Sequence, residues 1–187
     1  HILRMPKDFY FSGNEHNLDD KILEEIHEVR DQVASFSEQV RNGSRLGITG
    51  KQLINTVVVT CGGMHLGTEF VHDALSADMS AAEAAEGRIL HFLSSVDPVD
   101  TFLTTKNLDP AETLVVIVAK DFNSAETLNA RSAMTWLIQH LTKPGVVSDS
   151  QVIEKHVVAV TCMDNNFSKS APAQLGIPKY NVFRIWD

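Results

Sequence analysis

The chain has 187 residues, of which 43% are hydrophobic and 21% charged, a balance typical of one soluble globular domain. Its formal net charge of -8 argues against a nucleic-acid partner, because a polyphosphate backbone requires a basic surface. The sequence contains no apolar run of membrane-spanning length, and two cysteines, Cys61 and Cys162, do not make a disulfide framework. We therefore expect a cytoplasmic protein with reduced thiols and no membrane contact.

The amino-terminal part predicts one helix. Residues 1–17 have an irregular pattern, and apolar residues then recur every three or four positions between Ile22 and Val40. That spacing gives an amphipathic helix with one apolar face, which Asn42-Gly43 ends. We expect residues 1–45 to be a lead-in and a helix that packs on a single domain formed by residues 46–187.

Strand-like and helix-like patterns alternate along the rest of the chain. The predicted strands are 56–61, 89–93, 114–118, 156–161 and 181–185. The main predicted helices are 65–75, 99–107, 124–141, 149–154 and 166–175. This alternation is typical of an α/β domain with a parallel sheet and right-handed crossovers. Ligands bind such sheets beyond the carboxyl ends of the strands, so the loops that follow the strands are the candidate sites.

The loop at residues 60–67 follows the first strand and contains Gly62 and Gly63. Glycines let a ligand approach the backbone closely, and the next helix would direct its amino end at the same place. The loop has neither the G-x-G-x-x-G nor the G-x-x-x-x-G-K-[ST] spacing, so we expect no nucleotide cofactor. A tight turn that serves only helix–sheet packing is the alternative.

The loop at residues 119–124 follows the third strand and carries Lys120, the only cation in these two loops. A lysine beside a helix amino end is suited to a phosphate, although a solvated loop lysine fits the spacing equally well. Asn123 or Ser124 can cap the following helix, with Glu126 near the capping-box position.

Histidines near the first loop offer weaker alternatives. His65, Glu69 and His72 share one helical face at a spacing that can hold a metal. A polar outer face of that helix explains them better, so we expect no metal site. Cys61 with His65 could suggest a thiolate nucleophile, but nothing in the sequence orients the imidazole.

The two loops and their surroundings resemble the glucose-6-phosphate isomerase (phosphoglucose isomerase) family over residues 2–187. The family has T-G-K and then a strand ending in G-I-G-G-S-x-L-G, where this chain has T-G-K at 49–51 and T-C-G-G-M-H-L-G at 60–67. The family's S-K-T-F-T-T, followed by E-T, corresponds to A-K-D-F-N-S at 119–124 and E-T at 126–127. The stretches 92–100 and 128–131 are similar to plant-type members, and the chain ends partway through a motif similar to F-x-F-W-D-W-V-G-G-R.

The resemblance implies a three-layer α/β/α sugar-isomerase (SIS) domain with a five-stranded parallel, flavodoxin-like sheet. The parent protein would interconvert glucose 6-phosphate and fructose 6-phosphate in glycolysis and gluconeogenesis, without a cofactor. The family's catalytic groups follow the W-D-W-V-G-G-R motif, so no catalytic residue is expected in this chain, which alone should be inactive. Its expected partners are a sugar phosphate, the missing carboxyl-terminal half of the enzyme and other copies of itself. The corresponding phosphate-binding positions are Gly63, Met64, Ala119, Lys120, Asp121 and Ser124.

Several of these positions depart from the family pattern. Met64 and Ala119 replace serines, and Asp121 replaces a threonine, so donors are lost and a carboxylate is gained. A carboxylate about 4 Å from a phosphate charge costs on the order of 4 kcal/mol at an effective dielectric near 20. Phosphate binding is therefore expected to be weak or absent. The alternative function is a degenerate, non-catalytic SIS domain for ligand sensing or assembly.

Overall fold

The computed structural model describes residues 17–162 and 167–186, apart from the side chains of residues 17–20 and of Ser124. Its contacts divide the chain into two units, His1–Ser44 and Arg45–Asp187. In the first unit, α1 spans Asn17–Arg41, longer than the apolar pattern that predicted it. The packing of α1 on the second unit stays a prediction.

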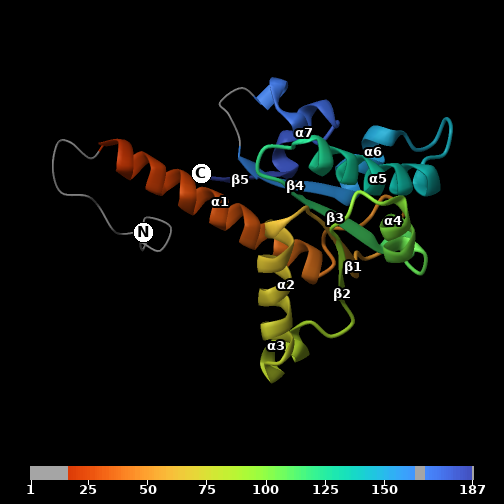
Figure 1. Cartoon of the computed structure of the whole chain (residues 1–187), viewed down its shortest axis with the longest axis horizontal. Helices are drawn as coiled ribbons and strands as arrows, with labels where there is room; N and C mark the ends of the chain where they lie inside the picture. Colours follow the sequence, from red (N-terminus) through yellow and green to blue (C-terminus); the bar gives the residue numbers. More distant parts are fainter. Residues whose placement is uncertain (1–16, 163–166, 187) are drawn as a thin grey trace. The chain divides into compact units, whose positions relative to one another are not determined.

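The second unit is built on five parallel strands (Figure 1). Their order across the sheet is β2-β1-β3-β4-β5, the flavodoxin-like order, so the predicted fold class is confirmed. Each strand lies within two residues of its predicted bounds. The strands are β1 Asn55–Val59, β2 Ile89–Leu93, β3 Thr113–Val118, β4 Val157–Cys162 and β5 Val182–Ile185.

The connections between the strands are mostly helical. They comprise α2 Gly63–Ser76, α3 Met79–Ala84, α4 Pro98–Thr105, α5 Ser124–Leu141, α6 Asp149–His156 and α7 Ala171–Gln174, with short 3-10 helices at Pro110–Glu112, Phe167–Lys169 and Lys179–Asn181. The single helix predicted over 166–175 is wrong, because two short helices stand there. Ser170 caps the second one, and Pro172 in its first turn is tolerated only at a helix start. Within the described residues, no helix has the length and apolar character needed to cross a membrane.

The core lies where the central strands meet α5 and α6. Alternate residues of β1, β3 and β4 point to the same face of the sheet and are almost fully buried. The long helix α5 covers them with small and large side chains, and α6 adds to the same cluster. The main members are Val57, Val59, Val115, Ile117, Val157, Ala159, Ala130, Ala133, Leu137 and Val152.

A buried histidine joins three segments of the second unit. His156 is 0% exposed and closes α6. Its Nε2 lies 2.9 Å from the Ile48 N–H, which can only donate, so Nδ1 carries the proton and donates to the Thr113 carbonyl at 2.7 Å. Burial lowers the pKa of His156, and the positive charge of Arg45 lowers it further. The neutral imidazole therefore holds the segment before β1 to the start of β3.

Gly47 makes room for this histidine, because a Cβ there would lie 2.7 Å from both the Ala111 carbonyl oxygen and His156 Cε1. We predict that Gly47→Ala lowers the free energy of unfolding by about 1–3 kcal/mol, the usual cost of overpacking. Urea denaturation measures the loss. Gly67→Ala is the matched control, since nothing lies within 4 Å of a Cβ at that helical position. Equal stabilities of the two variants would contradict the close packing.

Protonation of His156 would place a second N–H at Nε2, where it would face the Ile48 N–H and replace a hydrogen bond with a repulsive contact. The folded state therefore disfavours the protonated imidazole. The pKa of His156 is lower in the folded chain than its ordinary value of about 6.5, and the unfolded chain therefore binds more protons as the pH falls below that value. We predict that stability is complete above neutral pH and declines as the pH falls through 6. Denaturation midpoints at several pH values test this, and a His156→Gln variant should lose part of the decline. An equal loss of stability with falling pH in the parent chain and in His156→Gln would contradict this prediction.

Candidate functional site

The sheet order places the two candidate loops side by side. β1 and β3 pair along their length, ending at the partners Val59 and Ile117, and both chains leave the sheet at the same rim. The amide of Asn129 on α5 donates to the Thr60 carbonyl at 3.2 Å and ties the second loop's helix to the end of β1. Because β2 lies on the other side of β1, this is the point where the strand order reverses, which is where such sheets bind ligands.

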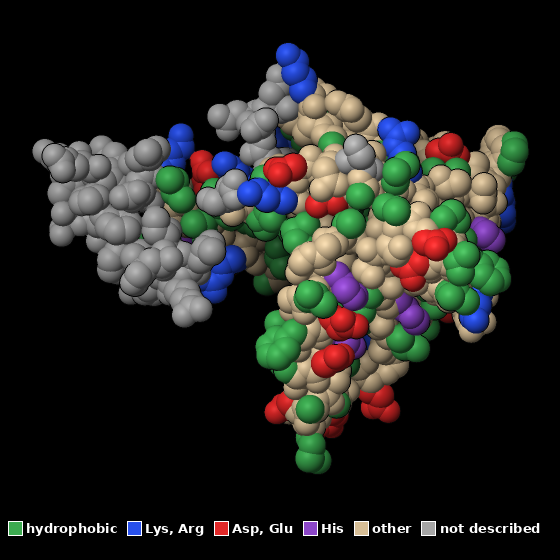
Figure 2. All heavy atoms as spheres, viewed as in Figure 1, with side chains coloured by type: hydrophobic (Ala, Val, Ile, Leu, Met, Phe, Trp, Pro, Cys, Tyr) green, Lys and Arg blue, Asp and Glu red, His purple; other side chains and the backbone are tan. Residues whose placement is uncertain are grey.

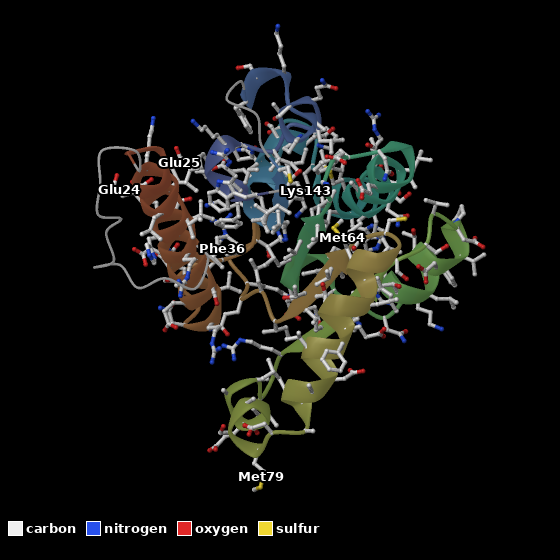
Figure 3. The ribbon with its side chains drawn as sticks, turned by 60° about the vertical axis from the view of Figure 1, so that its left-hand side comes forward. Glu24, Glu25, Phe36, Met64, Met79 and Lys143 are labelled. Atoms are coloured by element: carbon white, nitrogen blue, oxygen red, sulfur yellow. The ribbon has the colours of Figure 1, made fainter. Side chains whose placement is uncertain are left out.

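The first loop leaves the start of α2 open. Gly62 has φ 62° and ψ -135°, a conformation that residues with a Cβ rarely adopt. No side chain caps α2 and its first turn has no acidic residue, so backbone N–H groups remain to receive an anion. A Cβ added at Gly63 would meet nothing within 4 Å. Met64 is half-buried in that first turn (Figure 3), where the family pattern has a serine.

The second loop divides its residues between the core and the surface. Ala119 is 0% exposed and its N–H donates to the Val160 carbonyl, so it offers a ligand no hydrogen-bond donor. Phe122 has a positive φ of 50° and is buried in the core cluster. Between them, Lys120 and Asp121 are exposed. The loop thus presents one cation and one carboxylate at the surface, while Ala119 and Phe122 are buried.

The start of α5 is already occupied by its own cap. Asn123 accepts from the Glu126 N–H at 3.0 Å, and Glu126 accepts from the Asn123 N–H at 3.0 Å, so the expected capping box is present. The hydroxyl of Thr127 donates to the Phe122 carbonyl. Ser124 begins the helix, and its side chain lies outside the described residues. The buried Glu126 carboxylate therefore takes the place that an anion would favour at this helix end.

A cavity of about 360 Å³ opens on the β4 side of the second loop. Lys120, Asp121 and Phe122 form one wall, and Thr161 with Cys162 at the end of β4 forms another. The remaining lining residues are Lys169, Ser170, Ala171 and Pro172. Neither Gly63 nor Met64 is part of this lining. The sequence pattern does not identify Lys169, because this residue lies far from Lys120 along the chain and follows no strand directly. The fold places both lysines in the lining of the same cavity.

The histidines of α2 do not form a polar outer face, and that expectation is wrong. The rings of His65 and His72 pack against Phe92 of β2, with ring centroids 5.3 and 5.9 Å away. His65 Nε2 lies 3.2 Å from a Glu69 carboxylate oxygen. Among the described residues, no group of three ligating side chains could hold a metal ion. Both cysteines are free thiols.

Asn123→Ala removes the acceptor of the capping box. We predict a loss of about 1 kcal/mol in the free energy of unfolding, the typical value for an amino-terminal cap. Asn107→Ala is a suitable control, because Asn107 is exposed in the turn after α4, and such surface changes stay within about 0.5 kcal/mol. Thermal denaturation of the two variants should separate them; indistinguishable midpoints would mean that the cap contributes nothing.

Comparison with known proteins gives one consistent family. A family model described as phosphoglucose isomerase matches residues 15–187. The chain is 41% identical over 186 residues to the cytosolic glucose-6-phosphate isomerase of Zea mays and 42% identical over 186 residues to cytosolic isomerase A of Oryza sativa subsp. japonica. Both matches cover 99% of this chain but only 30% of the relative. The chain therefore spans about 30% of the length of the relatives that it matches.

A solved structure shares the fold over the whole chain. The glucose-6-phosphate isomerase of Chlamydia trachomatis D/UW-3/Cx superposes with a TM-score of 0.64 at 19% sequence identity. That match covers 100% of this chain and 29% of the Chlamydia chain. At this identity the likeness concerns the fold, and the family assignment depends on the sequence matches.

Proposed function

Because the chain belongs to the phosphoglucose isomerase family, we propose that it is the first sugar-isomerase domain of a cytosolic enzyme that interconverts glucose 6-phosphate and fructose 6-phosphate. The observation that carries this proposal is the juxtaposition of the loops after β1 and β3 at the point where the strand order reverses. The plant relatives are named cytosolic isomerases, which supports the location and the reaction proposed for the parent protein.

The proposed role of this domain is to hold the phosphate of the sugar. The open amino end of α2, at Gly63 and Met64, supplies backbone N–H groups and the positive end of the helix dipole. The second loop supplies Lys120, with Ala119 and Asp121 beside it and Ser124 at the start of α5. The two helix ends differ, because α5 is capped by Glu126 and α2 has no side-chain cap. We therefore place the phosphate nearer to α2.

Charge decides how well this site binds. Asp121 is exposed in the loop and opposes a phosphate dianion, at a cost on the order of 4 kcal/mol for a charge about 4 Å away. Lys120 and Lys169 offset part of that repulsion, because both line the same cavity as Asp121. Solvent reduces all of these energies at an exposed rim. The proposed result is a weak site with a dissociation constant in the millimolar range.

We propose that this chain alone does not catalyse the isomerisation. We infer from the family resemblance that the base and the proton-transfer partners lie in the part of such proteins that this chain does not span. The relatives are about three times longer than this chain, and the remainder of such a protein is the proposed source of those groups.

A degenerate, non-catalytic domain is the second candidate. The replacements at Met64 and Ala119 favour it, since one side chain is a thioether and the other is fully buried. The Thr127 hydroxyl, which survives from the family pattern, is bonded to the loop's own backbone. In this alternative the domain serves assembly, and the rim binds no sugar phosphate.

Titration with fructose 6-phosphate separates the two candidates. We predict millimolar binding in amide chemical shifts, with a loss of affinity of roughly fivefold or more in Lys120→Ala, because a hydrogen bond to a charged group is worth about 1.5–3 kcal/mol before solvent screening. Lys169→Ala should weaken binding less, because Lys169 lines the cavity but belongs to neither of the two loops. Asp121→Asn should strengthen it.

The matched control is Lys143→Ala. Lys143 is exposed just beyond the carboxyl end of α5, so it lies about 27 Å from the rim, the length of an 18-residue helix. Its replacement should leave the affinity unchanged. A folded chain that shows no shifts at any fructose 6-phosphate concentration would contradict the phosphate-binding role and leave the non-catalytic alternative.

The second unit also exposes many large apolar side chains between residues 66 and 103, among them Phe70 and Phe102. We propose that in the longer proteins the remainder of the chain covers part of this surface. For the 187-residue chain itself we propose self-association, because exposed apolar patches of this kind mark contact surfaces.

A further inference from the structure

Asn129 of α5 is a buried polar residue outside the two loops of the proposed phosphate site. Its side chain is 1% exposed, and its Nδ2 donates to the Thr60 carbonyl at 3.2 Å. A carbonyl oxygen only accepts, so this bond fixes which end of the amide faces Thr60. Thr60 is itself 2% exposed and is the first residue after β1. A side chain of α5 therefore holds the backbone at the point where the first loop begins.

This pair of polar side chains is buried at a cost. Within the part of the chain that the structure describes, neither Asn129 Oδ1 nor Thr60 Oγ1 has a hydrogen-bond partner. A buried oxygen without a partner gives up its bonds to water and gains none in return, so an apolar pair would favour the folded state more. Stability alone does not explain why a core keeps such groups. The bond from Asn129 to the Thr60 carbonyl is the part of this arrangement that reaches the candidate site.

The peptide bond between Thr60 and Cys61 turns this hydrogen bond into an orientation. No peptide bond among the described residues is cis. In a planar trans peptide the carbonyl and the following N–H point in opposite directions. The Thr60 carbonyl points at Asn129, so the Cys61 N–H points away from α5. Over residues 17–162 and 167–186 this N–H donates to no backbone carbonyl, which leaves it available to a ligand.

Backbone donors decide anion binding at the start of α2, because this helix brings no cation to the rim. Figure 2 shows acidic, histidine and hydrophobic side chains on the arm formed by α2 and α3. Both helices lie within the described residues, and neither contains Lys or Arg. The attraction must come from the N–H groups of residues 61–64 and from the helix dipole. The glycine pair lets this backbone rotate easily, so its direction needs an anchor.

Helix α5 carries the second loop and Asn129 together. The capping box of Asn123 and Glu126 fixes the first turn of α5, and Asn129 lies in the second turn. The hydroxyl of Thr127 also donates to the Phe122 carbonyl and fastens the second loop to the same helix. A displacement of the second loop therefore moves Asn129 and, through it, the carbonyl of the first loop.

We propose that Asn129 is a positioning residue of the phosphate site. By holding the Thr60 carbonyl, it directs the Cys61 N–H toward the anion and sets the first loop relative to the second. Asn129 touches no ligand, because its side chain is almost fully buried. This inference rests on the proposed phosphate-binding role and adds to it a residue that belongs to neither loop.

Asn129→Leu removes the donor and keeps a side chain of similar volume. Its dissociation constant for fructose 6-phosphate, measured from amide shifts of the folded variant, should be roughly threefold to tenfold higher than that of the parent chain, because a misdirected N–H weakens a hydrogen bond to a charged group. Asn181→Leu is the matched control. Asn181 is 0% exposed, and its Nδ2 donates to the carbonyls of Glu154 and Val157 at the amino ends of β4 and β5. This variant should lose stability but bind like the parent chain.

Thr60→Val separates the backbone of Thr60 from its side chain. The substitution removes Oγ1 but keeps the carbonyl that Asn129 holds. Its affinity for fructose 6-phosphate should equal that of the parent chain, and its stability should not fall, since Oγ1 has no partner among the described residues. A loss of affinity as large as in Asn129→Leu would assign the role to the hydroxyl and overturn the proposal.

Residual dipolar couplings of the backbone N–H groups test the orientation without a ligand. In the parent chain the Cys61 coupling should fit an N–H that points away from Asn129. In Asn129→Leu it should change, while the couplings of β1 and α5 stay the same. A scalar coupling across the hydrogen bond from Asn129 Nδ2 to the Thr60 carbonyl should be detectable in the parent chain, which covers the case in which the variant does not fold.

These readouts distinguish two failures. A parent chain that binds no fructose 6-phosphate would contradict the phosphate-binding role, and the dipolar couplings would still decide whether Asn129 orients the loop. A Cys61 N–H that points toward α5 in the parent chain, an unchanged Cys61 coupling in Asn129→Leu, or equal losses of affinity in Asn129→Leu and Asn181→Leu would each overturn the positioning role.

Discussion

The parallel pairing of β1 with β3 is the constraint on which the rest of this structure depends. The two strands lie at the centre of the sheet, where backbone groups have no access to water and must bond to each other. This pairing fixes their register from Asn55 and Thr113 to Val59 and Ile117. Both chains consequently leave the sheet at one level and on one rim. The starts of α2 and α5 follow from that pairing, and so do the positions of the loops at residues 60–67 and 119–124.

The sequence predicted the framework because the framework obeys local rules. Buried β-branched runs such as residues 114–118 can hardly be anything but inner strands, and the Asn123 capping box has a recognisable spacing. The loop chemistry was harder to predict. From the sequence, Ala119 is a position in the binding loop that has lost a side-chain hydroxyl. In the structure Ala119 is buried, and its backbone N–H donates to the Val160 carbonyl of β4. Lys169 was missed because two segments distant in sequence meet only through the fold.

The orientation of α2 could not be predicted for a related reason. Its sequence has two competing stripes, one of histidines with a glutamate and one of aliphatic residues with Phe70. Periodicity identifies both stripes but does not say which one meets the sheet. In the structure the histidine stripe meets the sheet, where His65 and His72 pack against Phe92 of β2. The chain spans about 30% of the length of the relatives that it matches.

The amino ends of α2 and α5 lie at the same rim of the sheet but differ in how they are capped. The Asn123–Glu126 capping box caps α5, whereas no side chain caps α2, which begins at the glycine pair. We propose that these two helix ends act as one site. Hydrogen exchange at the backbone amides, measured with and without saturating fructose 6-phosphate, tests it most directly. We predict slower exchange at residues 62–66 and 119–124 together. Protection confined to one of these segments, or found only elsewhere in the chain, would contradict it.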